Sequence, residues 1–177
     1  TMTETCDYFK VWFPLVAKLS DPANGRTLRF ETFESQARAI LKEFSGQTLV
    51  IGFQATRPSS LPPEEFLKFL TQAGHVRSLS GKTFHRIEEL IQTKWQKDSI
   101  FVVTDRIPTE KKNKGRLTEA ISNAIGHGQG VAQARDSNGK LLKNLHEGLR
   151  SPVNGRKFSL PLPPAFSFNS PVGACPT

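Results

Sequence analysis

The sequence predicts an α+β fold, with a mostly antiparallel sheet, helices packed on one face, an N-terminal helical arm and an irregular Pro/Phe-rich C-terminal segment. Three observations predict it. Several segments carry apolar residues at helical spacing, and short β-branched or aromatic segments outnumber the helices between them. The dipeptide Asn138-Gly139, flanked by strand-like segments, is a strong hairpin signal. Together they favour an antiparallel sheet with helices on one face.

Five segments predict helices. Residues 3–19 carry an apolar face, and Pro14 is expected to kink this helix because proline lacks the N–H donor. The second helix covers about 33–44, with Thr32 suited to cap its start and Gly46 to end it. The third begins at Pro62-Pro63 and ends at Gly74, a brief fourth covers 87–93, and the fifth, with apolar residues from Leu117 to Ile125, closes at Gly126.

The strands lie between these helices. Residues 48–56 and 99–107 are the clearest, because β-branched and aromatic residues dominate them. Two short strands, 76–79 and 82–85, flank Ser80-Gly81, and a hairpin pairs 130–135 with 140–145. A solvated basic loop is expected at 111–114.

Composition bounds the kind of protein. The 177 residues suffice for one compact domain with attached arms. No apolar run reaches the roughly eighteen residues of a membrane span, and the start does not resemble a signal segment. Two distant cysteines form no disulfide framework, which favours a reducing cytoplasm. Cys6 is expected to pack within its helix. The net charge of +8 favours polyanionic partners such as DNA, although solvated surface charge is an equally ordinary explanation.

The two ends of the chain carry specific motifs. Residues 164–177, PAFSFNSPVGACPT, end where one more residue would complete a Cys-Pro-x-Cys knuckle. This segment resembles the F-S-F-N-x-P-x-G-A-C-P-T-C segment of the UvrA family, the damage-recognition ATPases of bacterial nucleotide excision repair. Residues 1–10 are similar to the family's T-x-T-E-x-x-D-Y segment, and 74–77 and 101–106 to its G-hydrophobic-V-R and V-V-x-D-R strands. The chain is therefore expected to be a fragment of a longer protein.

The resemblance implies a division into three parts. Residues 1–19 would end a signature-domain helix, 20–150 would form a UvrB-binding-like α+β module, and 151–177 a degenerate zinc-knuckle segment. By resemblance, Arg77 and Arg106 would pair with acidic groups of UvrB, since a guanidinium can bond a carboxylate bidentately. The alternative is an ordinary exposed arginine beside a surface carboxylate such as Asp105.

The family's zinc site would need two cysteine pairs. Here Ser151 and Asn154 replace the cysteines of the first pair, and Cys175 is left as an orphan ligand. We therefore expect no metal in this chain and no zinc at this site of the parent. The turns 21–26 and 151–156 share the pattern x-Pro-x-Asn-Gly-Arg, which suggests that they pack side by side.

Two other functions stay open. The chain could be a module whose main ligand is the DNA backbone, with Arg150, Arg156 and Lys157 as phosphate contacts, and with Lys111, Lys112, Lys114 and Arg116 as a weaker set. A small stand-alone enzyme is the third possibility, but we find no P-loop, catalytic carboxylate pair or metal-binding histidine motif. The four histidines are expected to be structural. The parent would be an ATP-hydrolysing homodimer in the cytoplasm that loads UvrB onto damaged double-stranded DNA, with no membrane contact.

Overall fold

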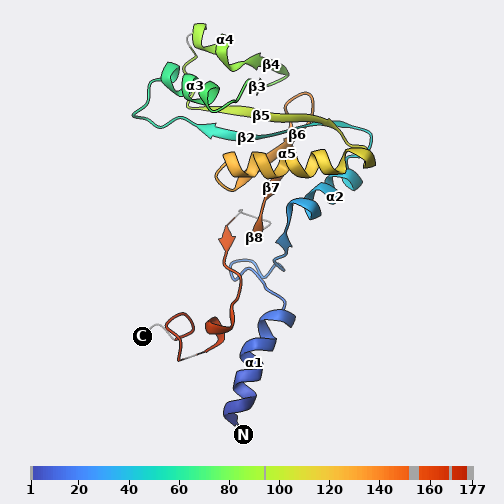
Figure 1. Cartoon of the computed structure of the whole chain (residues 1–177), viewed down its shortest axis with the longest axis vertical. Helices are drawn as coiled ribbons and strands as arrows, with labels where there is room; N and C mark the ends of the chain where they lie inside the picture. Colours follow the sequence, from blue (N-terminus) through green and yellow to red (C-terminus); the bar gives the residue numbers. More distant parts are fainter. Residues whose placement is uncertain (1, 94, 152–155, 168, 175–177) are drawn as a thin grey trace. The chain divides into compact units, whose positions relative to one another are not determined.

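The computed structural model describes residues 2–93, 95–151, 156–167 and 169–174 (Figure 1). The chain forms two compact units. One consists of Thr1–Phe30 with Gly148–Thr177, and the other of Glu31–Glu147. The functional boundaries at residues 19 and 150 stay a prediction.

The second unit is built on a six-stranded antiparallel sheet, as the sequence predicted. Its strands are β2 (Thr48–Thr56), β3 (Arg77–Ser80), β4 (Thr83–Arg86), β5 (Ser99–Pro108), β6 (Val131–Arg135) and β7 (Leu141–His146). Their order is β4-β3-β5-β2-β6-β7. β2 and β5 are the two middle strands of this order, and β5 pairs with β2 along the whole length of β2.

Four α-helices belong to this unit: α2 (Phe33–Glu43), α3 (Pro63–Gln72), α4 (Ile87–Gln92) and α5 (Lys114–His127). Thr32 caps α2 as expected: Ser35 N–H donates to its side chain at 3.1 Å, and Ser35 Oγ accepts from Thr32 N–H at 3.0 Å. The fifth helix was predicted to close at Gly126, but it continues to His127. The basic loop is a short 3₁₀ turn, η1 (Lys111–Asn113), that leads directly into α5.

The helices pack on one face of the sheet. Side chains alternate along a strand, so Leu49, Ile51 and Phe53 of β2 share a face. Leu49 and Ile51 pack in one cluster with buried residues of α2 and α5, and Phe53 packs in a second cluster with α3 and α4. Figure 1 shows α5 running along β2 and β5. Each fully buried aliphatic side chain here contributes about 1.5–3 kcal/mol of transfer free energy.

The opposite face carries a small cluster without helical residues. Val50, Leu79 and Phe101 are buried there, with Val103 packed against them. The turns of the two outer hairpins also meet, because a Cβ added to Gly139 would lie 2.0 Å from the carbonyl oxygen of Gly81.

A β-bulge interrupts the central pair. The register changes between Ile51, opposite Asp105, and Gly52, opposite Val103, so Thr104 is the extra residue. A Cβ at Gly52 would lie 2.1 Å from the carbonyl oxygen of Val102, which explains why glycine stands at this close approach.

The first unit contains α1 (Met2–Val16), β1 (Phe30–Glu31), β8 (Gly148–Arg150), β9 (Lys157–Phe158) and the 3₁₀ turn η2 (Pro163–Phe166). The three strands form a small sheet in the order β1-β8-β9. Pro14 lies inside α1, which ends at Val16, earlier than predicted. Phe13 meets Phe166 edge to face at 5.3 Å.

Most of the apolar face of α1 is exposed: Phe9 is 54 % exposed and Trp12 is 55 % exposed. Cys6 is also exposed, so the expectation that it packs within the helix was wrong. Phe166 covers Phe13 on the apolar face of this helix but does not bury Cys6. No described helix is both long and apolar enough to cross a membrane.

Candidate protein-interaction site

An open groove of about 1030 Å³ lies beside β5. Both arginines singled out from the sequence, Arg77 and Arg106, line it. It exists because β3 is short: Arg77, the first residue of β3, pairs with Val103 of β5. Beyond that pair, Thr104–Arg106 lie next to β2 on one side and line the groove on the other. We call it the β5 groove.

Arg77 and Arg106 are both exposed and reach the groove from neighbouring strands. The Arg106 guanidinium lies over the ring of Phe84, with its Cζ 5.7 Å from the ring centroid. Among the described residues, neither arginine side chain makes a hydrogen bond or an ion pair. Each guanidinium therefore keeps its hydrogen-bond donors available for a carboxylate from outside.

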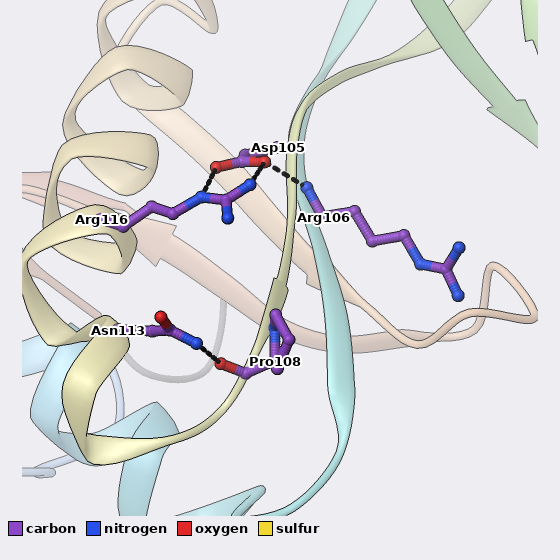
Figure 2. A network of polar contacts seen from close by, with 5 residues as sticks. All are labelled: Asp105, Arg106, Pro108, Asn113 and Arg116. Carbon is purple, nitrogen blue, oxygen red and sulfur yellow. Dashed lines mark hydrogen bonds and ion pairs between the residues drawn. The ribbon is translucent and has the colours of Figure 1, made fainter.

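Asp105 does not neutralise Arg106 (Figure 2). Its carboxylate accepts two hydrogen bonds from Arg116 of α5, from Nε at 2.8 Å and from Nη2 at 2.7 Å. It also accepts the backbone N–H of Arg106 at 2.7 Å, while the Arg106 side chain points away from it. Asp105 raises the pKa of Arg116 through these hydrogen bonds and its charge. Arg106 is thus an exposed arginine beside a carboxylate that does not pair with its guanidinium, and both interpretations of it drawn from the sequence stay predictions.

The connection between β5 and α5 is held by Asn113. Its Nδ2 donates to the carbonyl oxygen of Pro108 at 2.9 Å, which ties the start of α5 to the end of β5 (Figure 2). Pro108 and Asn113 thus fix the turn that brings Arg116 back beside Asp105. A local contact of this kind positions a charged pair that lies eleven residues apart.

A pair of histidines also lines the groove. The rings of His75 and His127 are 4.8 Å apart and nearly perpendicular, and Phe53 contacts both. Burial lowers the pKa of His75, and the neighbouring His127 lowers it further. No local spacing in the sequence connects this pair, because His75 lies just after α3 and His127 is the last residue of α5.

The two echoing turns of the first unit do touch at their first residues. Ser151 Oγ donates to Asp21 Oδ2, and both residues are buried. Each turn closes with the same bond: Asp21 N–H donates to Arg26 O at 2.8 Å, and Ser151 N–H donates to Arg156 O at 2.9 Å. The hydrogen bond from Ser151, followed by that from Ala23, lowers the pKa of Asp21. We call this contact the Asp21–Ser151 clasp.

Of the three residues named for the zinc site, only Ser151 belongs to the described residues, and Asn154 and Cys175 lie outside them. A neutral serine hydroxyl bound to a carboxylate is not the thiolate that a structural zinc site uses, so Ser151 does not fit the metal. Among the described residues, no three His, Cys, Asp or Glu side chains gather as a metal site would require.

The candidate phosphate-binding residues lie partly together. Arg150 of β8 stands directly opposite Lys157 of β9, and the Arg156 guanidinium lies 5.4 Å from the ring of Phe158. The second basic set does not form one surface. Lys112 pairs with Glu110, and Arg116 with Asp105.

Comparison with known proteins identifies the family of the chain. Residues 32–138 match the family model of the UvrA interaction domain. The chain is similar to UvrABC system protein A of Borreliella burgdorferi (29 % identical over 182 residues, 99 % of the chain) and of Aquifex aeolicus (28 % over 180 residues, 100 % of the chain). The corresponding protein of Thermus thermophilus is 26 % identical over 179 residues, 99 % of the chain.

The chain covers 19 % of the length of each of these three relatives. The family match spans β2 to β6 with the β5 groove, and so includes both arginines. The chain belongs to the UvrA interaction domain family.

Proposed function

We propose that the chain is the UvrB-docking module of a UvrA-like protein in nucleotide excision repair, and that the β5 groove is its contact surface. One observation carries the proposal. Arg77 and Arg106 are exposed without a described acidic partner, while Asp105, the one acidic residue that lines the groove within the described chain, is already paired with Arg116. The groove therefore presents net positive charge to a partner that brings carboxylates.

The neighbouring apolar atoms suit a protein partner. Val76 is 58 % exposed and Phe84 is 36 % exposed, and both line the groove beside the two arginines. Apolar surface next to unpaired guanidinium groups is the composition of an interface centre, where arginine is enriched. Docking would bring UvrB to damaged DNA, while ATP hydrolysis belongs to other parts of a cytoplasmic, homodimeric parent.

Charge reversal tests the proposal. Arg77→Glu and Arg106→Glu should each weaken binding of purified UvrB by about tenfold or more, because each places a like charge against an acidic partner. Lys42→Glu is the matched control: it makes the same charge change on an exposed residue of α2 outside the groove. Surface plasmon resonance with immobilised UvrB measures all three. Unchanged affinity in both arginine variants would rule out the groove as the docking surface.

A DNA-contacting role is the second candidate, and the pair Arg150–Lys157 favours it. The β8–β9 pairing places the cations Arg150 and Lys157 opposite each other on neighbouring strands, and such a pair of positive charges attracts phosphate. Fluorescence anisotropy with duplex DNA should show affinity that falls steeply with salt, and the double variant Arg156→Gln/Lys157→Gln should reduce that slope. Binding that is insensitive to both changes would exclude this role.

The parent protein should also lack zinc at the knuckle segment that begins at residue 151. Ser151 stands where the family has a cysteine ligand, and the Asp21–Ser151 clasp links the two turns instead. Metal analysis of the purified chain by atomic emission should find less than one zinc per molecule, and a chelator should leave its melting temperature unchanged.

A further inference from the structure

A second, smaller pocket of about 320 Å³ lies at the other end of the β3–β5 ladder. The ladder registers only Arg77 with Val103 and Ser78 with Val102. Past these pairs, the residues after Ser78 on β3 and those before Val102 on β5 line the pocket from two sides. The pocket is thus formed where two strands of one sheet stop pairing.

The titratable residues that line this pocket are all basic in type. They are Arg135 from β6, Lys97 from the loop before β5, and His85 from β4. Lys97 Nζ donates to Ser80 Oγ at 3.4 Å, which places the ammonium group beside β3. No carboxylate lines the pocket among the described residues.

Arg135 is the central feature. It is half-buried, and its guanidinium lies 4.1 Å from the centroid of the Phe101 ring. Its hydrogen bonds go only to neutral acceptors: to Gln133 Oε1 from Nε at 3.0 Å and from Nη2 at 2.7 Å, and to Gln54 Oε1 at 3.4 Å. Burial lowers its pKa, because removing the cation from water disfavours the charged form.

The nearest acidic residues in the sequence are committed elsewhere. Asp98 pairs with Arg57 at 2.9 Å. Asp136, which follows Arg135, accepts the backbone N–H groups of Asn138 and Lys140 at 2.9 and 2.8 Å and so holds the hairpin turn. The guanidinium of Arg135 is therefore partly desolvated without a counter-ion in the described chain.

Ser78 supplies an independent observation. Ser78 lines the pocket and is 1 % exposed, yet its Oγ has no hydrogen-bond partner among the described residues. Buried hydroxyl groups nearly always have a partner, and a group bound in this pocket would supply one. A hydroxyl donor and basic side chains around one small space are complementary to a tetrahedral oxyanion.

We propose that this pocket binds a phosphate group, with Arg135 as the main charge partner, Ser78 Oγ as a donor, and Lys97 and His85 at its rim. Arginine and lysine favour phosphate oxygens through charge-assisted hydrogen bonds. The volume is at the lower end of small-molecule sites, which admits inorganic phosphate or a small phosphorylated molecule. A bound anion would bridge β3, β5 and β6 across the gap where the β3–β5 ladder ends.

Calorimetric titration of the 177-residue chain with inorganic phosphate tests the site, at an ionic strength held constant with sodium chloride. Adenosine monophosphate in a parallel titration distinguishes the two sources of the phosphate group. Equal or weaker binding of the nucleotide indicates the free anion, and tighter binding indicates a nucleotide. The absence of binding in both titrations at 10 mM ligand, on the order of the weakest useful affinity, would overturn the proposal.

Two variants locate the phosphate-binding site. Arg135→Gln should weaken phosphate binding by about tenfold or more, since it removes a charged donor. Lys42→Gln, which removes one charge outside the pocket, should leave binding unchanged. Equal losses in these two variants would mean that the net charge of +8, and not the pocket, attracts phosphate.

Ser78→Ala gives a second readout that survives if Arg135→Gln does not fold. Without phosphate, the variant should melt at the same or a higher temperature, because an unpaired buried hydroxyl is removed. With saturating phosphate, it should gain less in melting temperature than the unmodified chain, because ligand stabilisation follows affinity. A gain equal to that of the unmodified chain would exclude Ser78 as a donor and count against the site.

Discussion

Both carboxylate oxygens of Asp105 accept hydrogen bonds from Arg116 (Figure 2). The guanidinium of the adjacent Arg106 lies over the ring of Phe84 and has no hydrogen-bond or ion-pair partner among the described residues. The alternation of side chains along β5 separates these roles, because consecutive residues of a strand point to opposite faces of the sheet. Asp105 lies on the helix-covered face, opposite Ile51, and Arg106 on the other face, opposite Val50. Neighbouring residues of one strand thus differ in their contacts: Asp105 pairs with α5, and Arg106 keeps an exposed guanidinium.

Asp105→Asn is expected to leave UvrB binding unchanged or tighter, because it removes the only negative charge that lines the groove in the described chain. The cost in folding stability should be small, about 0.2–1 kcal/mol, since the pair is partly exposed. Urea denaturation measures the stability, and the UvrB titration measures the binding. Binding weakened as much as in Arg106→Glu would show that Asp105 itself contacts UvrB.

The Asp21–Ser151 clasp predicts an acid-sensitive first unit. The folded pKa of Asp21 is lowered, so its contribution to stability is present above the ordinary pKa of 3.8 and is lost as the pH falls through the lower folded value. Ser151→Ala should lower the melting temperature by roughly 2–4 °C at pH 7 and reduce the acid sensitivity. Ser170→Ala, an exchange in the same unit away from the clasp, is the control. Identical acid profiles in the two variants would contradict the role of Ser151.

His75 predicts a second pH effect with a different window. Its folded pKa is lowered from 6.5 by burial and by His127, so the unfolded chain binds a proton at higher pH than the folded chain does. Stability should therefore rise with pH across the window just below 6.5 and level off above it. His75→Gln should flatten this rise, while His85→Gln should keep it. Equilibrium unfolding in urea at pH 5.5 and 7.5 provides the measurement.

The contact between the two hairpin turns predicts different costs for two glycine substitutions. Gly139 and Gly46 both have positive φ, 82° and 79°, but only a Cβ on Gly139 meets another group, the carbonyl of Gly81. Gly46→Ala should cost about 1–2 kcal/mol from the left-handed backbone alone. Gly139→Ala should cost clearly more, because the turns must separate. Equal costs by thermal unfolding would show that the turns do not pack in solution.

Local patterns explain why much of the second unit could be predicted. The helical spacing of Ala37, Ile40, Leu117, Ala120 and Ile121 predicted the helices, and these residues are buried in the core. Thr32 was identified as a cap because capping depends on residues within one turn. The end of α5 was misjudged at Gly126 because glycine is tolerated inside a helix when packing against the sheet outweighs its entropy cost.

Amino-acid order alone determined the antiparallel α+β architecture and the basic character, because alternation and helical periodicity act over a few residues. The choice of Arg77 and Arg106 rested on the resemblance to the UvrA family. Three contacts were decided only by the tertiary structure. Arg116 pairs with Asp105, the ring of His75 contacts that of His127, and Arg135 lies over Phe101 with no carboxylate partner among the described residues. These contacts join residues brought together by strand register and by a bulge. Register is a property of the whole sheet, which follows from the total burial of its two faces and not from any single segment.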